Sequence, residues 1–233
     1  MTDSPVLSVV IPSYNEEKRL PATLATLLPY LRGRGESFEV VVVNDGSKDA
    51  TSAVAIQAGP EVRVIENPGN RGKGYSVRNG MLNARGAWRL MTDADLSTPI
   101  EDLEVLKAAL TDGAQVAIAS RAVAGANLEK RQSMARESSG RFFNLIVQWL
   151  HLPGIRDTQC GFKLFSAAAA EAAFRHARLD GFAFDVEALV LAKRAGFKIK
   201  EVPVTWRNDD QSRVNFLSGL AAFGELFKLW FRR

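Results

Sequence analysis

Short runs of aliphatic residues alternate along the chain with segments in which apolar residues recur every three or four positions. Six of these runs have the length and composition of β-strands, and the first two are almost continuously apolar, as expected for strands covered on both faces. The six runs lie at residues 6–12, 38–44, 62–66, 87–92, 114–120 and 197–204. Because strands and helices alternate, the pattern predicts an α/β fold with a mostly parallel sheet and right-handed crossovers.

The apolar residues between these runs predict amphipathic helices. One helix is expected between the first two strands. Another is expected after Thr98, which is predicted as its N-cap, with Pro99 as the first helical residue. The apolar stripes consist of Leu20, Leu24, Leu27, Leu28 and Leu31 in the first helix, and of Ile100, Leu103, Leu106 and Leu110 in the second.

Two further apolar stretches, residues 139–152 and 214–233, also have helical spacing. We expect one α/β domain over residues 1–205, followed by an amphipathic helical segment over residues 206–233. The apolar face of that segment fits packing on the sheet, a contact between two copies, or a place in a membrane interface with basic residues toward anionic headgroups. The residues alone leave these alternatives open.

Composition limits the class of protein. The chain has 233 residues, 46% of them hydrophobic, and a net charge of +4, which suits anionic ligands and surfaces and gives no indication of a nucleic-acid partner. The single cysteine, Cys160, excludes an internal disulfide framework. No stretch resembles a signal peptide or approaches the ~18 apolar residues of a membrane-spanning helix. We therefore expect a cytoplasmic protein, peripheral at the cytosolic face of a membrane if it is membrane-bound.

Polar clusters follow three of the predicted strands, at residues 12–17, 44–51 and 92–97. In open parallel sheets ligands bind outside the carboxyl ends of the strands, although each cluster alone also fits turn and cap chemistry. The pair of Asp93 and Asp95 favours a ligand-binding site over turn and cap chemistry. Alternate strand residues point to the same side, and two converging carboxylates oppose each other's ionisation unless a positive charge lies between them.

The residue types narrow the kind of site. The first strand is not followed by G-x-G-x-x-G, and Lys73 is not followed by the Ser or Thr of a P-loop. His151 and His176 are scattered, without the spacing of zinc ligands, and no G-x-S-x-G elbow marks a serine nucleophile. Paired aspartates without soft ligands favour Mg²⁺ or Mn²⁺ shared with phosphate oxygens. Such a cation would stabilise a diphosphate leaving group.

Six motifs occur in the order typical of one enzyme family. They are SVVIPSYNEE, VVVNDGSKDAT, NRGKGYSVRNGM, TDADLS, DTQCGFKLF and GFAFDVEAL. Over residues 6–215 the chain resembles the family 2 glycosyltransferases of GT-A fold, a Rossmann-like α/β architecture. More narrowly, it resembles the polyprenyl-phosphate sugar transferases, and DTQCGFKLF and FDVE are closer to the dolichyl-phosphate β-glucosyltransferases than to the mannosyltransferases.

The resemblance implies a nucleotide-sugar site. Asp45 would hydrogen-bond the nucleobase or ribose, and Lys73 and Arg71 would be cationic partners of the donor, with a solvated loop as the alternative. Asp93 and Asp95 match the D-x-D metal motif, with Ser97 able to add an oxygen. The implied donor-binding residues are Pro12, Tyr14, Glu16, Asp45, Lys73, Asp93, Ala94 and Asp95.

The resemblance also implies an inverting reaction, in which the acceptor attacks opposite the leaving nucleoside diphosphate. A hydroxyl acceptor needs a carboxylate to take its proton. Asp185 matches the usual position of that base, with Asp157 and Glu187 as further candidates. A phosphate acceptor is already anionic and needs cations instead.

Arg121 resembles the arginine that binds the acceptor phosphate and is our first choice for that role. The region around Arg136 and Ser139, or their neighbours Arg131 and Ser138, would complete the binding site for the acceptor phosphate. Arg213 corresponds to a basic residue near the diphosphate, where an arginine suits phosphate well.

The function implied is transfer of a hexose to a polyprenyl phosphate, with Mg²⁺ or Mn²⁺ as cofactor. UDP-glucose is the favoured donor and GDP-mannose the alternative. The membrane would be reached through the amphipathic helices, and a homodimer is compatible with the sequence. Two other functions stay open: transfer to a soluble or glycan hydroxyl, and non-catalytic binding of a nucleotide sugar. The crowded pair Asp93 and Asp95 argues against the last.

Overall fold

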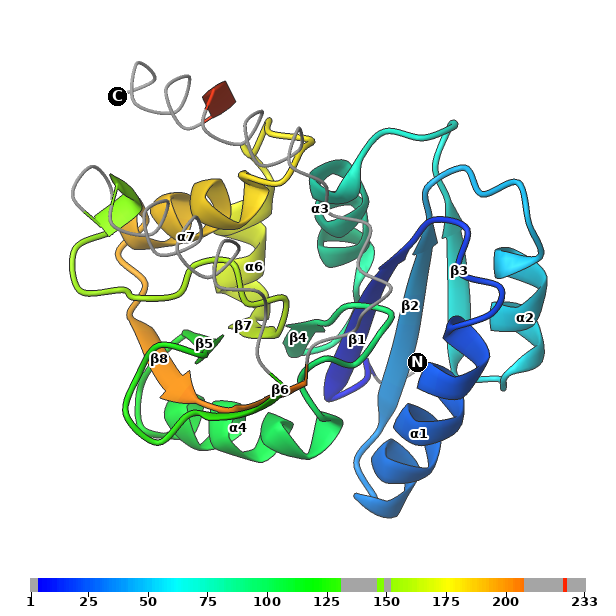
Figure 1. The fold of residues 1–233 in the computed structure, drawn as a ribbon, viewed down its shortest axis with the longest axis horizontal. Helices are drawn as coiled ribbons and strands as arrows, with labels where there is room; N and C mark the ends of the chain where they lie inside the picture. The colour runs from blue at the N-terminus through cyan, green and yellow to red at the C-terminus, as the bar shows by residue number, and fades with distance from the viewer. Residues whose placement is uncertain (1–3, 131–145, 149–151, 208–223, 226–233) are drawn as a thin grey trace.

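The structure is a computed structural model that describes residues 4–130, 146–148, 152–207 and 224–225. Its centre is a seven-stranded sheet (Figure 1). The strands are β1 (Leu7–Ser13), β2 (Phe38–Asn44), β3 (Val62–Glu66), β4 (Trp88–Met91), β5 (Val116–Ser120), β7 (Lys163–Ser166) and β8 (Ile199–Pro203). Their order is β3-β2-β1-β4-β7-β5-β8, and only β7 runs antiparallel to its neighbours. The predicted α/β fold with a mostly parallel sheet is confirmed.

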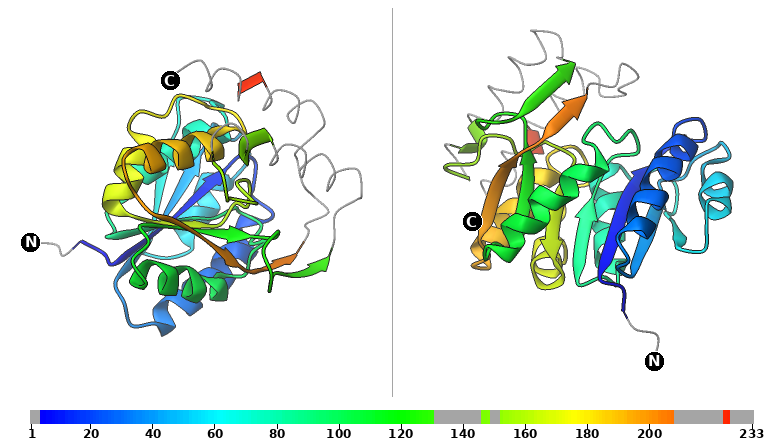
Figure 2. Two further views of the ribbon diagram at one scale, coloured as in Figure 1. Left: turned by 90° about the vertical axis from the view of Figure 1, so that its left-hand side faces the viewer. Right: turned by 90° about the horizontal axis from the view of Figure 1, so that it is seen from below.

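Helices cover both faces of the sheet and produce three layers (Figures 1 and 2). They are α1 (Leu20–Gly33), α2 (Thr51–Gln57), α3 (Lys73–Asn83), α4 (Leu103–Thr111), α6 (Ala167–Phe174) and α7 (Phe184–Arg194). The two predicted apolar stripes bury their side chains in one core cluster, beneath α1 and α4, and α3, α6 and α7 cover the other face. Because both faces are covered, the valines of β2 are fully buried.

The predicted start of the second helix is wrong. Pro99 precedes a 3₁₀ turn, η1 (Ile100–Asp102), and α4 begins at Leu103. Thr98 makes no cap hydrogen bond to this turn; its hydroxyl instead lies 3.7 Å from the sulfur of Cys160.

All six predicted strands are present, and three others were not predicted. β7 is inserted between β4 and β5, and β6 (Asn127–Lys130) pairs with β9 (Thr205–Arg207) in a separate two-stranded parallel sheet. The expected division between residues 1–205 and 206–233 therefore falls within β9 and stays a prediction.

The predicted helices at residues 139–152 and 214–233 lie largely outside the described residues. Of them, residues 146–148, 152 and 224–225 are described; the two short pieces 146–148 and 224–225 are helical, and Leu152 is not. Within the described part of the chain, no helix is both long enough and apolar enough to span a bilayer.

Candidate active site

The polar loops after β1 and β2 are joined to each other by hydrogen bonds. The amide of Asn15 donates to Ser47 Oγ at 2.8 Å, and the side-chain oxygen of Asn15 accepts from the amide of Lys48 at 2.8 Å. The carboxylate of Glu17 accepts from the amide of Ala50 at 3.0 Å. The two clusters predicted to meet at the carboxyl edge of the sheet therefore form one continuous surface.

Asp45 follows β2 and holds the glycine-rich turn that precedes α3. It is 4% exposed, and its carboxylate accepts from the amides of Arg71 at 2.9 Å and Gly72 at 2.8 Å and from the side chain of Asn67 at 2.9 Å. These bonds fix the chain just before Lys73, so Asp45 supports the site whether or not it also contacts a nucleobase.

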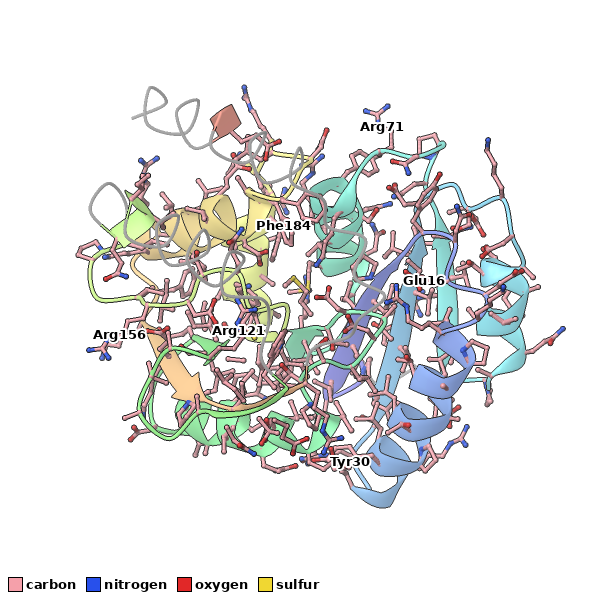
Figure 3. All side chains as sticks on the ribbon, viewed as in Figure 1. Glu16, Tyr30, Arg71, Arg121, Arg156 and Phe184 are labelled. Atoms are coloured by element: carbon pink, nitrogen blue, oxygen red, sulfur yellow. The ribbon has the colours of Figure 1, made fainter. Side chains whose placement is uncertain are left out.

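The other predicted donor-binding residues of the first loop belong to the same surface, formed by the loops after β1 and β2. Pro12 is half-buried at the end of β1, and Tyr14 is half-buried in the following loop. Glu16 is buried, and Arg19 binds both of its carboxylate oxygens at 2.8 Å. Arg71 points away from the body of the molecule (Figure 3), and its guanidinium lies 5.0 Å from the ring of Tyr75.

Asp93 and Asp95 lie in the loop after β4, and Lys73 supplies the positive charge beside them. β4 ends at Met91, so the prediction that strand alternation aligns the two aspartates is wrong, and the turn brings them together instead. Lys73 Nζ contacts Asp93 Oδ1 at 2.7 Å. Burial raises the pKa of Asp95, and the neighbouring charge of Asp93 raises it further.

The neighbouring main chain fixes this loop. The amide of Ser97 donates to Asp95 Oδ1 at 2.9 Å, and the buried Ala94 accepts a hydrogen bond from the hydroxyl of Thr23. Gly161 presses directly against Asp93: a Cβ added at Gly161 would lie 2.1 Å from Asp93 Oδ2. A side chain at that position would displace the carboxylate.

Asp185 lies in the first turn of α7 and is paired with Lys163 of β7. Both side chains are buried, and Lys163 Nζ donates to Asp185 and to the carbonyl oxygen of Cys160. Burial raises the pKa of Asp185 despite the opposing charges of Lys163 and Lys73. Asp185 also acts on Lys73: burial opposes the charge of that lysine, but Asp93 and Asp185 outweigh it and raise its pKa.

Arg121 and Asp157 form a two-point ion pair beyond β5. Arg121 donates from Nε to Asp157 Oδ2 at 2.7 Å and from Nη2 to Oδ1 at 2.9 Å. Burial opposes ionisation of Asp157, but the charge and hydrogen bonds of Arg121 are stronger and lower its pKa. Glu16 and Arg121 lie on either side of β4 in Figure 3, in keeping with the strand order.

Glu187 has a different position from the one expected of a base. It is 3% exposed, and one of its oxygens accepts from the amides of Arg178 and Leu179, at 2.8 and 2.7 Å. It therefore holds the loop that precedes α7. Arg136, Ser139 and Arg213, together with the alternatives Arg131 and Ser138, lie outside the described residues.

The oxygen ligands at the carboxyl edge fit a hard cation shared with a diphosphate. Among the described residues, no group of three or more His, Cys, Asp or Glu side chains is arranged to hold a metal alone. Mg²⁺ needs no such cage, because it is commonly bound through one or two carboxylates plus substrate phosphates and water. Asp93 and Asp95 match that donor set.

The sequence analysis missed Lys163, although a signal was present. A lysine in the apolar run from Phe162 to Phe165 implies a buried partner, because an unpaired buried ammonium is very costly. The site as a whole is a row of opposite charges at one sheet edge, running from Lys73 and Asp93 through Asp185 and Lys163.

The chain is similar in sequence to known proteins. A family model described as glycosyl transferase family 2 matches residues 8–179. The dolichyl-phosphate β-glucosyltransferase of Homo sapiens is 43% identical over 233 residues, covering 91% of this chain and 71% of the relative. That of Saccharomyces cerevisiae is 37% identical, covering 89% of this chain and 69% of the relative.

Solved structures share the fold. Glucosyl-3-phosphoglycerate synthase of Mycobacterium tuberculosis, in complex with UDP, superposes with a TM-score of 0.74 at 19% identity, covering 96% of this chain and 79% of that chain. The same enzyme with Mn²⁺, UDP and glucosyl-3-phosphoglycerate gives a TM-score of 0.75 at 19% identity, with the same coverage of both chains. The predicted GT-A architecture is confirmed.

Proposed function

Since this chain belongs to glycosyl transferase family 2, we propose that it transfers glucose from UDP-glucose to a polyprenyl phosphate. A phosphate oxygen of the acceptor forms the new bond to the anomeric carbon while the bond from that carbon to the diphosphate breaks, with inversion. The observation that carries the proposal is the cluster of Lys73, Asp93 and Asp95 beside the buried pair of Asp185 and Lys163. The named activity of the relatives and the UDP and Mn²⁺ of the solved neighbours support the donor, acceptor and cofactor.

On the donor side, Asp93 and Asp95 would hold the cation, and Lys73 would lie beside the diphosphate. When bound, the cation would neutralise charge on the leaving diphosphate. Lys73 contributes a fixed positive charge, which its two acidic neighbours keep protonated. The surface formed by the hydrogen-bonded loops after β1 and β2 would bind the nucleoside.

On the acceptor side, the pairing of Asp185 favours a phosphate over a hydroxyl. A base must be within hydrogen-bond reach of the proton that it takes, but the carboxylate of Asp185 is buried and already accepts from Lys163. A phosphate acceptor needs no base, and the guanidinium of Arg121 suits its oxygens. The acceptor is a lipid, so the reaction would take place at a membrane surface.

A hydroxyl acceptor is the second candidate, favoured by the raised pKa of Asp185. Asp185→Asn separates the two, because asparagine can still accept from Lys163 but cannot take a proton. We expect the variant to keep measurable transfer to a lipid phosphate. Complete loss in a correctly folded protein would favour the hydroxyl acceptor.

The deciding experiment is a panel of donors and acceptors. UDP-glucose, UDP-galactose, UDP-N-acetylglucosamine and GDP-mannose would each be offered with Mg²⁺ or Mn²⁺, with and without a polyprenyl phosphate in detergent. We expect a lipid-dependent, chelator-sensitive glycolipid from UDP-glucose. Product from GDP-mannose alone would change the donor, and product that survives the chelator would overturn the metal assignment.

A further inference from the structure

One aromatic ring lies over the guanidinium of Arg121, and the sequence analysis assigned it no role. Trp206 of β9 places its ring centroid 5.3 Å from Arg121 Cζ. Trp206 is only 8% exposed. Arg121 is therefore held along one edge by Asp157 and against one face by Trp206.

The backbone on both sides of Trp206 is fixed. The amide of Thr205 donates to Asp102 Oδ2 at 2.7 Å, and the amide of Arg207 donates to the carbonyl oxygen of Ser97 at 2.8 Å. Across the small sheet, Trp206 pairs with Leu128 of β6. These bonds fix the backbone that carries the ring, and the ring itself is buried against its neighbours.

The same strand reaches the D-x-D loop. Ser97, which accepts from Arg207, donates its own amide to Asp95 Oδ1 at 2.9 Å. Two hydrogen bonds thus connect the strand that carries Trp206 with the carboxylate of Asp95. β9 touches both the proposed metal loop and the proposed acceptor arginine.

We propose that Trp206 is a positioning residue that sets Arg121 to bind the phosphate monoester of the acceptor, an inference that rests on the proposed function. Asp157 uses Nε and Nη2 of Arg121, and no acceptor among the described residues is bonded to Nη1. The indole ring fixes the plane in which that nitrogen can donate.

Two physical effects give Trp206 this role. A cation over an aromatic face is attracted by the ring quadrupole, more strongly where water is excluded. The ring also keeps water from one face of the guanidinium, which strengthens the attraction of Arg121 for a phosphate. Asp157 partly neutralises Arg121, so a fixed orientation matters more than it would for a lone arginine.

The test compares Trp206→Leu, Trp206→Phe and the wild-type protein in steady-state transfer from UDP-glucose to a polyprenyl phosphate in detergent. We expect Trp206→Leu to raise the KM for the lipid phosphate roughly tenfold, the loss of about 1.4 kcal/mol of cation–π and orientation energy. The KM for UDP-glucose and kcat should change less than about twofold. Trp206→Phe keeps an aromatic face and should restore most of the affinity.

Two controls separate positioning from folding. Trp88→Leu removes a half-buried tryptophan at the start of β4, the end of that strand opposite to the candidate site, and it should leave the acceptor KM unchanged. Binding of a short isoprenyl phosphate, measured by calorimetry with inorganic phosphate as competitor, should weaken in Trp206→Phe and more so in Trp206→Leu. If Trp206→Leu does not fold, Trp206→Phe still tests the proposal, because the smaller aromatic face should weaken binding measurably and unchanged binding would contradict the role of the indole ring.

Three results would overturn the proposal. An unchanged acceptor KM in Trp206→Leu would remove the role of Trp206 and leave the proposed function intact. Equal losses in both KM values and in thermal stability would make Trp206 a purely structural residue. A wild-type protein that transfers no glucose to lipid phosphate would overturn the proposed function itself, and the role of Trp206 with it.

Discussion

Four acids of the candidate site, two on the proposed donor side and two on the proposed acceptor side, differ in what their carboxylates bind. On the donor side, which comprises the loops after β1, β2 and β4, acids such as Asp45 and Glu17 accept hydrogen bonds from backbone amides and hold loops in place. On the acceptor side, around β5, β7 and α7, Asp157 and Asp185 are each paired with a buried or half-buried cation.

The difference determines what a substitution costs. A carboxylate that binds amides can be replaced with the loss of a charge-assisted hydrogen bond or two, typically about 1.5–3 kcal/mol each. A buried ion pair that loses one member leaves an uncompensated charge, at a cost of about 3–5 kcal/mol. Asp93 and Asp95 differ from both groups, because the proximity of two carboxylates is unfavourable for folding, and we attribute it to the cation that they are proposed to hold.

The largest expected effect is on activity and comes from Asp95→Ala. Removal of one proposed metal ligand should lower turnover by about a thousandfold, the rate equivalent of several kcal/mol. The thermal midpoint should stay the same or rise, because one of two crowded carboxylates is gone. Asp112→Ala, which removes an exposed acid paired with Lys200, is the control and should leave turnover unchanged.

The next effect is on stability and tests the acceptor side. Lys163→Met should destabilise the protein by about 3–5 kcal/mol, because Asp185 is left buried without its partner. The double variant Lys163→Met/Asp185→Leu should recover most of that loss. Urea unfolding at neutral pH measures both, and a double variant as unstable as the single one would contradict the charge explanation.

A smaller effect depends on pH. Arg121 lowers the pKa of Asp157 in the folded state, so the stability from this pair is present above the unfolded pKa of about 3.9 and is lost as the pH falls through the folded pKa. Asparagine still accepts one hydrogen bond from Arg121, which is only half-buried. Asp157→Asn should therefore cost less than the loss of a fully buried partner, about 1.5–3 kcal/mol at pH 7, and the difference from wild type should shrink toward pH 3. A difference that does not depend on pH would show that the charge of Asp157 contributes nothing.

The smallest effect on stability is expected on the donor side. Asp45→Asn keeps one oxygen acceptor, its amide nitrogen then faces an N–H donor, and the change should cost about 1.5 kcal/mol. Because Asp45 fixes the turn before Lys73, the KM for UDP-glucose should rise while the KM for the lipid phosphate stays constant. A change in the acceptor KM would show that the two sides are not separable.

The sequence predicted the donor side better than the acceptor side. The aliphatic runs that became β1 and β2, and the polar loops that follow them, are local patterns of burial and turn chemistry. The proximity of Asp93 and Asp95 was also predicted from their spacing, although a turn and not a strand brings them together. The role of Glu187 as a candidate base stays a prediction, and nothing in GFAFDVEAL indicates that its carboxylate accepts from the amides of Arg178 and Leu179.

By itself, therefore, the sequence determined the alternation of strands and helices, the apolar stripes and the polar clusters at the carboxyl edge, because each depends on neighbouring residues. Only the tertiary structure decided which charged and aromatic side chains are paired with each other. β7 enters the sheet antiparallel and brings Lys163 to Asp185, and the return of β9 brings Trp206 to Arg121. These contacts join segments far apart in the chain, and strand order, which no local pattern specifies, decides which charges meet.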